Sequence, residues 1–136
     1  MLVDAKNVEN YVPQRSPILL VDNLLEIDGS KAYTSYQIKD SVFVSNSDFE
    51  YHGVIEHLAQ SSALFYGYLH GNKIGMIGSI SRLKKEQFEL KIHDVIESEI
   101  NLMMEFNDLI SVKAKSFFDG IEIMSCDMTL HFDSSK

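Results

Sequence analysis

Two different periods of hydrophobic and polar residues run along this chain, and each predicts one kind of element. The apolar run ILLVDNLLEI (18–27) predicts a mostly buried strand. The turn signal DGS (28–30) follows it, and alternation in 31–38 then predicts a second strand paired with the first in a hairpin. The residues expected on one face of this second strand are Ala32, Thr34, Tyr36 and Ile38.

The middle of the chain changes to helical spacing. Residues 41–53 are a polar and aromatic loop, and residues 54–71 then carry apolar or small side chains three and four positions apart. These side chains are Val54, Ile55, Leu58, Ala59, Ser62 and Phe65 or Tyr66. We therefore expect a helix here that other elements wrap closely, with Gly71 as a candidate C-cap after His70.

Only strand signals follow the helix. The expected strands cover 74–83, 88–92, 98–106, 109–118 and 121–132, with an Asp-Gly hairpin turn between the last two. Two strands, one helix and a run of antiparallel strands predict the α+β class. A sheet with a single helix buries that helix on its concave face. The pattern therefore predicts a hot-dog fold, a curved antiparallel sheet around one central helix, as a single domain over 1–136.

Composition and charge narrow the function. The chain is 45% hydrophobic and 24% charged, which is typical of a globular domain. Its net charge of −8 disfavours nucleic acid as a general partner. No apolar run is long enough for a membrane span, the N-terminus does not resemble a signal peptide, and a single cysteine fits a reducing compartment. We therefore expect a cytoplasmic protein with no membrane partner.

Two motifs carry a family resemblance. The stretch YVPQRSPILLVDNLLEID (11–28) resembles the opening LPHRYPFLLVDRVLEID of the 3-hydroxyacyl-acyl-carrier-protein dehydratases of fatty acid synthesis. The stretch GVIEHLAQ (53–60) resembles GVLIIEALAQ on the central helix of that family. The residues that keep the spacing of the second motif are Glu56, Leu58, Ala59 and Gln60.

The resemblance implies a hot-dog fold, usually dimeric, with active sites at the subunit interface. The reaction it implies is reversible syn loss of water from a (3R)-hydroxyacyl thioester on acyl carrier protein, giving the trans-2-enoyl thioester. The family uses a histidine and a helix glutamate, and the acyl tail enters a tunnel between subunits. The implied partners are acyl carrier protein with its acyl-phosphopantetheine, and a second hot-dog subunit that is identical (a homodimer) or different (a heterodimer).

The histidine of the family is missing from its usual place. The family carries it in a GHFPG loop, but Val42 stands at that position here and residues 41–51 contain no histidine. The family's MPGV before the helix is replaced by YHGV (51–54). A divergent branch found in aryl-polyene pigment clusters also lacks the HFPG loop and keeps GIEYxAQ at the helix, and GVIEHLAQ resembles that branch more closely.

Glu56 and His52 are the candidate catalytic pair. Dehydration needs one group to remove the C2 proton and another to protonate the departing hydroxyl. Facing an apolar tunnel, the Glu56 carboxyl would favour its neutral, proton-donating form; on pattern alone it only complements the helix dipole. His52 lies at the helix N-terminus, where the dipole favours the neutral ring of a general base. Its alternatives are capping the helix or pairing with Asp48 or Glu50.

Three neighbours of this pair have supporting roles. The N–H of Gly53 is a candidate for polarising the thioester carbonyl, unless the glycine only permits the turn. Gln60 lies one turn after Glu56 on the same face, where it orients Glu56 or lines the site. His57 points about 100° away from Glu56 around the helix, so we interpret it as a packing or interface residue.

The basic stretch 82–85 is the candidate docking site for an acidic carrier protein, through Arg82, Lys84 and Lys85. The alternative is a solvated strand end. Neither the other histidines nor any zinc, phosphate-loop or dinucleotide motif indicates a metal or cofactor, and we expect none. The residues expected to fill the core are Cys126, Met103, Met104, Met124 and Met128, and an acyl tunnel would also suit the four methionines.

Three functions are open on the sequence. The first is the dehydratase, with Glu56 as general acid and His52 as base. The second is a hot-dog acyl thioesterase, in which a helix carboxylate activates water or attacks the thioester without a histidine. The third is a non-catalytic subunit that pairs with an active hot-dog protein and helps to form its tunnel. The missing loop histidine favours the second and the third.

Overall fold

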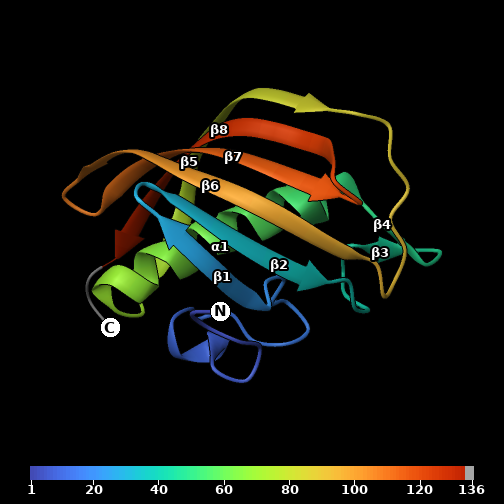
Figure 1. Ribbon diagram of the computed structural model, residues 1–136, viewed down its shortest axis with the longest axis horizontal. Helices are drawn as coiled ribbons and strands as arrows, with labels where there is room; N and C mark the ends of the chain where they lie inside the picture. Colours follow the sequence, from blue (N-terminus) through green and yellow to red (C-terminus); the bar gives the residue numbers. More distant parts are fainter. Residues whose placement is uncertain (134–136) are drawn as a thin grey trace.

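A curved antiparallel sheet and one long helix make up most of the structure (Figure 1). The computed structural model describes residues 1–133, and residues 134–136 of the predicted domain lie outside the described part. In chain order the elements are η1 (Val8–Asn10), β1 (Asn23–Asp28), β2 (Lys31–Gln37), β3 (Val44–Ser45), β4 (Asp48–Phe49), α1 (Tyr51–His70), β5 (Ile74–Lys85), β6 (Val95–Phe106), β7 (Leu109–Phe118) and β8 (Ile121–Asp133).

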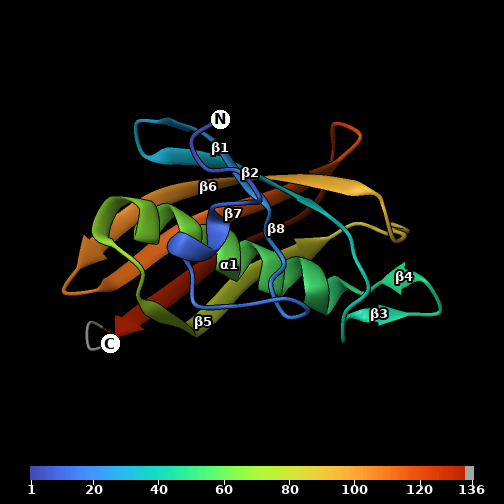
Figure 2. The same ribbon diagram turned by 90° about the horizontal axis from the view of Figure 1, so that it is seen from below.

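Six strands form the large sheet in the order β1-β2-β6-β7-β8-β5, and all neighbours are antiparallel. Tight turns with positive φ join β1 to β2, β6 to β7 and β7 to β8. The strand after the helix, β5, pairs with β8 and is therefore an edge of the sheet. Figure 2 shows α1 beneath the curved sheet, with the N-terminal segment beside the helix. This arrangement confirms the predicted α+β class.

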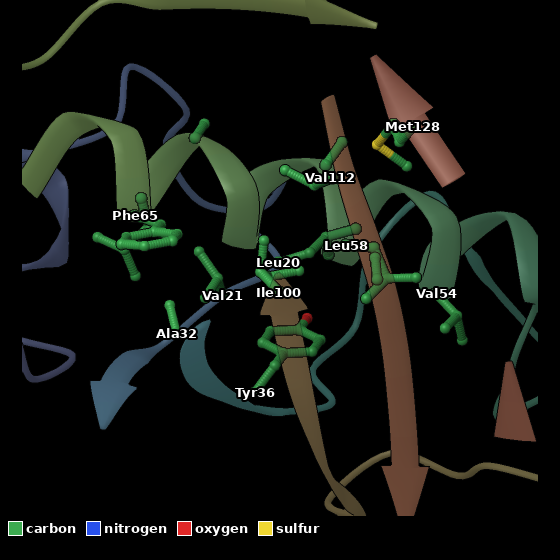
Figure 3. Close-up of a cluster of buried hydrophobic side chains, with 14 of the residues drawn as sticks. Leu20, Val21, Ala32, Tyr36, Val54, Leu58, Phe65, Ile100, Val112 and Met128 are labelled. Atoms are coloured by element: carbon green, nitrogen blue, oxygen red, sulfur yellow. The ribbon is translucent and has the colours of Figure 1, made fainter. Parts of the chain in front are cut away.

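The helix is buried because the sheet and the N-terminal segment both pack against it. Side chains from the helix and the strands meet in the core of Figure 3, among them Val54, Leu58, Phe65, Ile100 and Val112. Close approach of the N-terminal segment depends on one small residue. A Cβ on Gly67 would lie 2.1 Å from the carbonyl oxygen of Tyr11, so no larger residue fits there.

Several predictions from the pattern are confirmed. The alternating residues of β2, from Ala32 to Ile38, are at most 1% exposed on the predicted face. The strand β7 has the predicted bounds, and the Gly71 N–H caps α1 by donating to the Gly67 carbonyl at 2.8 Å. Met124, Met128 and Cys126 are buried. Within residues 1–133, no helix combines the length and the apolar character that a membrane span requires.

Two predicted strands are wrong in part or entirely. Residues 18–22 precede β1 and are not a strand of the sheet; helix side chains, described below, bind the backbone of Ile18 and Leu20, and the Asp22 N–H donates to the Ser35 carbonyl of β2. Residues 88–92 form no strand of the large sheet; they pair with the β3–β4 hairpin through a bridge between Asp48 and Lys91, whose side chains also form an ion pair. Both segments are apolar because they cover the core, and apolar character alone does not distinguish a covering segment from a strand.

The loop and the methionines also need correction. Residues 41–53, predicted as a loop, contain the short hairpin of β3 and β4 and the first turn of α1. Met103 and Met104 are 53% and 64% exposed and lie at a bulge near the turn that joins β6 to β7. They do not fill the core.

Candidate active site

A pocket of about 250 Å³ lies between α1, β5 and the N-terminal segment. Three polar side chains border it: Gln14, Glu56 and Gln60. Its other walls come from Ala59 and Ala63 of α1, residues 75–77 of β5 and Leu130 of β8. The pocket thus combines one carboxyl group, two amides and an apolar lining. Such a combination suits an acyl chain that carries a polar group at one end.

Gln60 holds Glu56 and the N-terminal segment together. Its Oε1 accepts the Leu20 N–H at 2.6 Å, and its Nε2 donates to the Ile18 carbonyl at 3.0 Å. The same Nε2 donates to Glu56 Oε2 at 3.2 Å. Gln60 is buried, whereas Glu56 is half-buried at the pocket. The buried Gln60 amide therefore orients the Glu56 side chain. This contact is one of the two roles that the one-turn spacing suggested for Gln60.

His57, the next residue along the helix, faces the sheet and is fully buried. Its Nδ1 lies 2.6 Å from the Leu20 carbonyl oxygen, and its Nε2 lies 2.8 Å from Ser98 Oγ. A carbonyl only accepts, so Nδ1 carries the proton and Nε2 accepts from the hydroxyl. Burial lowers the pKa of His57 from 6.5 to about 4, which keeps the ring neutral. Its surroundings agree with a packing role.

A chain of buried hydroxyl groups surrounds His57. Ser98 Oγ lies 2.7 Å from Ser116 Oγ, and Thr34 Oγ1 lies 2.8 Å from Ser61 Oγ. This group of five side chains, which we call the buried polar layer, connects α1 to β2, β6 and β7. Sequence reasoning missed it, although each strand hydroxyl occupies an inward position in phase with apolar neighbours. That phase is the signal that marks a buried polar residue.

His52 does not meet Glu56 within one chain. It is exposed in the first turn of α1, with its ring 4.0 Å from the ring of Tyr51. Within residues 1–133 no hydrogen bond joins His52 to Glu56, and His52 is not part of the pocket lining. The Gly53 N–H donates to the Glu50 carbonyl at 2.9 Å, so the turn occupies the group that we expected to polarise a thioester.

The three residues of the predicted docking site differ in their surroundings. Arg82 pairs with Asp127 at 2.6 Å, and Lys85 Nζ lies 4.8 Å from the centre of the Tyr51 ring. Lys84 borders a shallow pocket of about 180 Å³, together with two further lysines, Lys113 and Lys115. Sequence reasoning missed these two because they lie on β7, in a different part of the sequence from β5. In the sheet, β8 lies between β7 and β5.

Comparisons with known proteins place these features in context. A family model described as ApeP-like, ApeP dehydratase, matches residues 6–130. No curated protein matches the sequence. Among solved structures, a chain of the dehydratase heterocomplex ApeI:P from Xenorhabdus doucetiae is similar with a TM-score of 0.84 at 14% identity, covering 94% of this chain and 91% of that chain.

Two further structures are more distant. Cj0977, a sigma28-regulated virulence protein from Campylobacter jejuni, has a TM-score of 0.65 at 16% identity, with 90% and 83% of the two chains covered. A hypothetical thioesterase with coenzyme A from Streptococcus pneumoniae has a TM-score of 0.62 at 10% identity, with 84% and 87% covered. At such identities these structures establish the shared fold alone, which is the predicted hot-dog fold.

Proposed function

The chain belongs to the ApeP-like dehydratase family, and from that membership we propose that it removes water from (3R)-hydroxyacyl thioesters on acyl carrier protein. The product is the trans-2-enoyl thioester. The observation that carries this proposal is Glu56, a helix carboxyl group that Gln60 orients at a pocket with apolar walls. A carboxyl group at a pocket with both polar and apolar walls is one of the two groups that the elimination needs.

The proposed reaction has two proton transfers. A base takes the C2 proton, and the electrons of the C2–H bond form the C2–C3 double bond. The C3–O bond breaks as the Glu56 carboxyl donates its proton to the departing oxygen, which leaves as water. Glu56 ends as a carboxylate and regains a proton before the next cycle.

We propose His52 as the base, brought to the reacting carbon by assembly with a second subunit. In one chain His52 is exposed and does not border the Glu56 pocket. An exposed histidine in the first turn of a helix is available to a neighbouring subunit. His52 of one subunit would then serve the Glu56 pocket of the other, or a different hot-dog subunit would supply its own base.

The edge strand β5 is the surface that we propose for this assembly. It contributes residues 75–77 to the Glu56 pocket and exposes apolar side chains beside it, such as Met76 at 70% and Ile77 at 38%. A second hot-dog subunit on this edge would extend the pocket toward a tunnel. The similar chain from Xenorhabdus doucetiae comes from a heterocomplex, which supports a different hot-dog protein as the partner alongside a homodimer.

The lysines of β5 and β7 are the proposed contact for the acidic carrier protein. Lys84 and Lys115 pair with the same residue, Ser125 of β8, from opposite sides and lie on one surface. Charge reversal at either lysine should raise the KM for the carrier-bound substrate several-fold. The KM for the same acyl group on free pantetheine should not change, which separates docking from catalysis.

A thioesterase is the second candidate. It is favoured because, within residues 1–133, no histidine borders the Glu56 pocket, and a carboxylate alone activates water in such enzymes. The fold is also shared with a hypothetical thioesterase. Family membership favours the dehydratase. A non-catalytic subunit is the third candidate. Its function would be to bind an active hot-dog protein through the β5 surface.

One experiment separates the three. The protein, alone and co-expressed with a hot-dog partner, is incubated with a 3-hydroxyacyl and with a saturated acyl thioester, and enoyl product and free thiol are measured. The variants are Glu56→Gln and His52→Ala. Enoyl product that is lost in both variants supports the dehydratase with this base. Free thiol that survives His52→Ala supports the thioesterase, and inactivity on both substrates supports the partner subunit.

A further inference from the structure

Inside one chain, the side chain of His52 contacts a single aromatic ring. The centres of the Tyr51 and His52 rings lie 4.0 Å apart, and the two ring planes meet at 32°. Within residues 1–133 the His52 side chain has no hydrogen bond or ion pair. An exposed side chain without such partners turns among several rotamers. The contact with Tyr51 is therefore what limits the orientation of the His52 ring.

Tyr51 itself is held more firmly than His52. It is half-buried and packs against the hydrophobic core, whereas His52 is exposed. The Nζ of Lys85 also lies over the Tyr51 ring, 4.8 Å from its centre. The face of an aromatic ring attracts an ammonium group at this distance. Tyr51 thus connects an exposed histidine to the core and to a lysine of the sheet.

The sheet determines where the Lys85 side chain points. Lys85 is the last residue of β5 and pairs with Met124 of β8, which is buried in the core. Paired residues share one face of a sheet, so Lys85 lies on the face that carries α1. Lys84 lies on the opposite face, because side chains alternate along a strand. The two lysines are adjacent in the sequence but belong to different surfaces.

We infer that Tyr51 is a positioning residue for His52, and that Lys85 holds Tyr51 in turn. This inference rests on the proposed dehydration, in which His52 is the base. Removal of the C2 proton needs the base nitrogen within hydrogen-bond reach and aligned with the C–H bond. A histidine that turns freely in solvent spends little time in that geometry. The Tyr51 ring restricts the turning and so raises the fraction of His52 rings that are ready to react.

The same contacts connect His52 to the edge at which we propose assembly. The strand β5 is the edge that a second hot-dog subunit would cover, and Lys85 is its last residue. In the proposed reaction His52 serves the Glu56 pocket of the other subunit, so its ring must be aimed across the interface. The contacts from Lys85 to Tyr51 and from Tyr51 to His52 set that direction relative to β5. Loss of either contact should therefore slow the proton transfer without weakening substrate binding.

Kinetics and NMR of matched variants test this inference. Tyr51→Leu removes the ring, and Tyr51→Phe keeps it. Lys85→Met removes the charge and keeps an apolar side chain, and Lys85→Arg keeps a cation. Tyr68→Leu, the same change at an exposed tyrosine near the other end of α1, is the control. Each variant is measured as the full chain in the assembly that gives enoyl product in the wild type, and urea unfolding checks that it is folded.

Tyr51→Leu should lower kcat about tenfold, as the loss of one aromatic pair implies, and should change KM by less than about twofold. Lys85→Met should lower kcat about threefold. Tyr51→Phe, Lys85→Arg and Tyr68→Leu should keep the wild-type kcat. The ring current of Tyr51 should shift the resonances of the His52 ring protons, and this shift should be absent in Tyr51→Leu. If Tyr51→Leu does not fold, Tyr51→Met is measured in its place.

A second background shows whether the effect passes through His52. Added to His52→Ala, Tyr51→Leu should cause no further loss of rate. A folded Tyr51→Leu variant with the wild-type kcat overturns the positioning role and leaves the dehydratase proposal in place. An equal further loss in the His52→Ala background also overturns the positioning role alone. A wild type that forms no enoyl product contradicts the proposed function itself.

Discussion

His57 and Glu56 are neighbours in the sequence but belong to regions of opposite character. His57 lies in the buried polar layer, where each ring nitrogen has a partner and the hydroxyls bond to one another. Glu56 lies half-buried at the pocket, where Gln60 contacts it on one side. The contrast teaches that residues with complete hydrogen bonding hold the helix against the sheet, whereas a residue with one side left open borders the pocket.

The largest effect should follow Glu56→Gln. The amide has nearly the shape of the carboxyl but cannot donate the proton that the leaving hydroxyl needs. We expect enoyl formation to fall at least about a hundredfold. Because Glu56 is half-buried at a pocket, the free energy of unfolding should change by less than about 1 kcal/mol. Rate assays and urea unfolding together check this prediction. A loss of stability large enough to explain the lost rate would contradict the assignment of Glu56 to the pocket instead of to the structural region.

His57→Ala should give the reverse result. It removes a buried ring and leaves the Leu20 carbonyl and the Ser98 hydroxyl without their partner, so we expect a loss of about 3 kcal/mol in the free energy of unfolding. His52→Ala is the matched control, since an exposed histidine should cost less than about 0.5 kcal/mol. Urea unfolding measures both. Equal losses in the two variants would contradict the assignment of His57 to the buried polar layer.

Acid should act on the buried polar layer through His57. The unfolded chain takes up a proton on this ring near pH 6.5, whereas burial keeps the folded ring neutral down to a pKa of about 4. Between these values the unfolded state binds more protons, so stability is lost as the pH falls. The loss should approach roughly 3 kcal/mol at the acid end of the window. Urea unfolding of His57→Gln, across the same pH range, should lack this part of the pH dependence.

Gln60→Met tests the one side chain that joins the two regions. It frees Glu56 and also leaves the backbone of Ile18 and Leu20 without partners. We expect a moderate loss of both kinds, about tenfold in rate and about 1–2 kcal/mol in the free energy of unfolding. Ser62→Ala, which removes only a bond to the Leu58 carbonyl within α1, is the control. If Gln60→Met lowers the stability but not the rate, Gln60 has a structural role only and does not orient Glu56 for the reaction.

The sequence predicts the parts of the molecule in which one pattern controls one element. The inward face of β2 and the bounds of β7 follow from alternation, because each inward position is filled by a side chain that the core buries. Glu56 and Gln60 follow from a motif whose spacing is that of one helical turn. Their hydrogen bond is therefore a local consequence of the helix.

The rest depends on contacts between distant segments. Residues 18–22 have the composition of a strand, but the backbone of Ile18 and Leu20 bonds to side chains of α1, some 40 residues away in the chain. Met103 and Met104 were assigned to the core by type, but they lie near the end of β6, where the sheet leaves them exposed.

The bare edge of β5 has a consequence for the cell. An uncovered strand with apolar side chains is a template for uncontrolled pairing with other chains, and the lysines at its end protect only part of it. Under the proposed assembly, in which a second hot-dog subunit covers this edge, chains left without that subunit should aggregate, and solubility then depends on a matched supply of both.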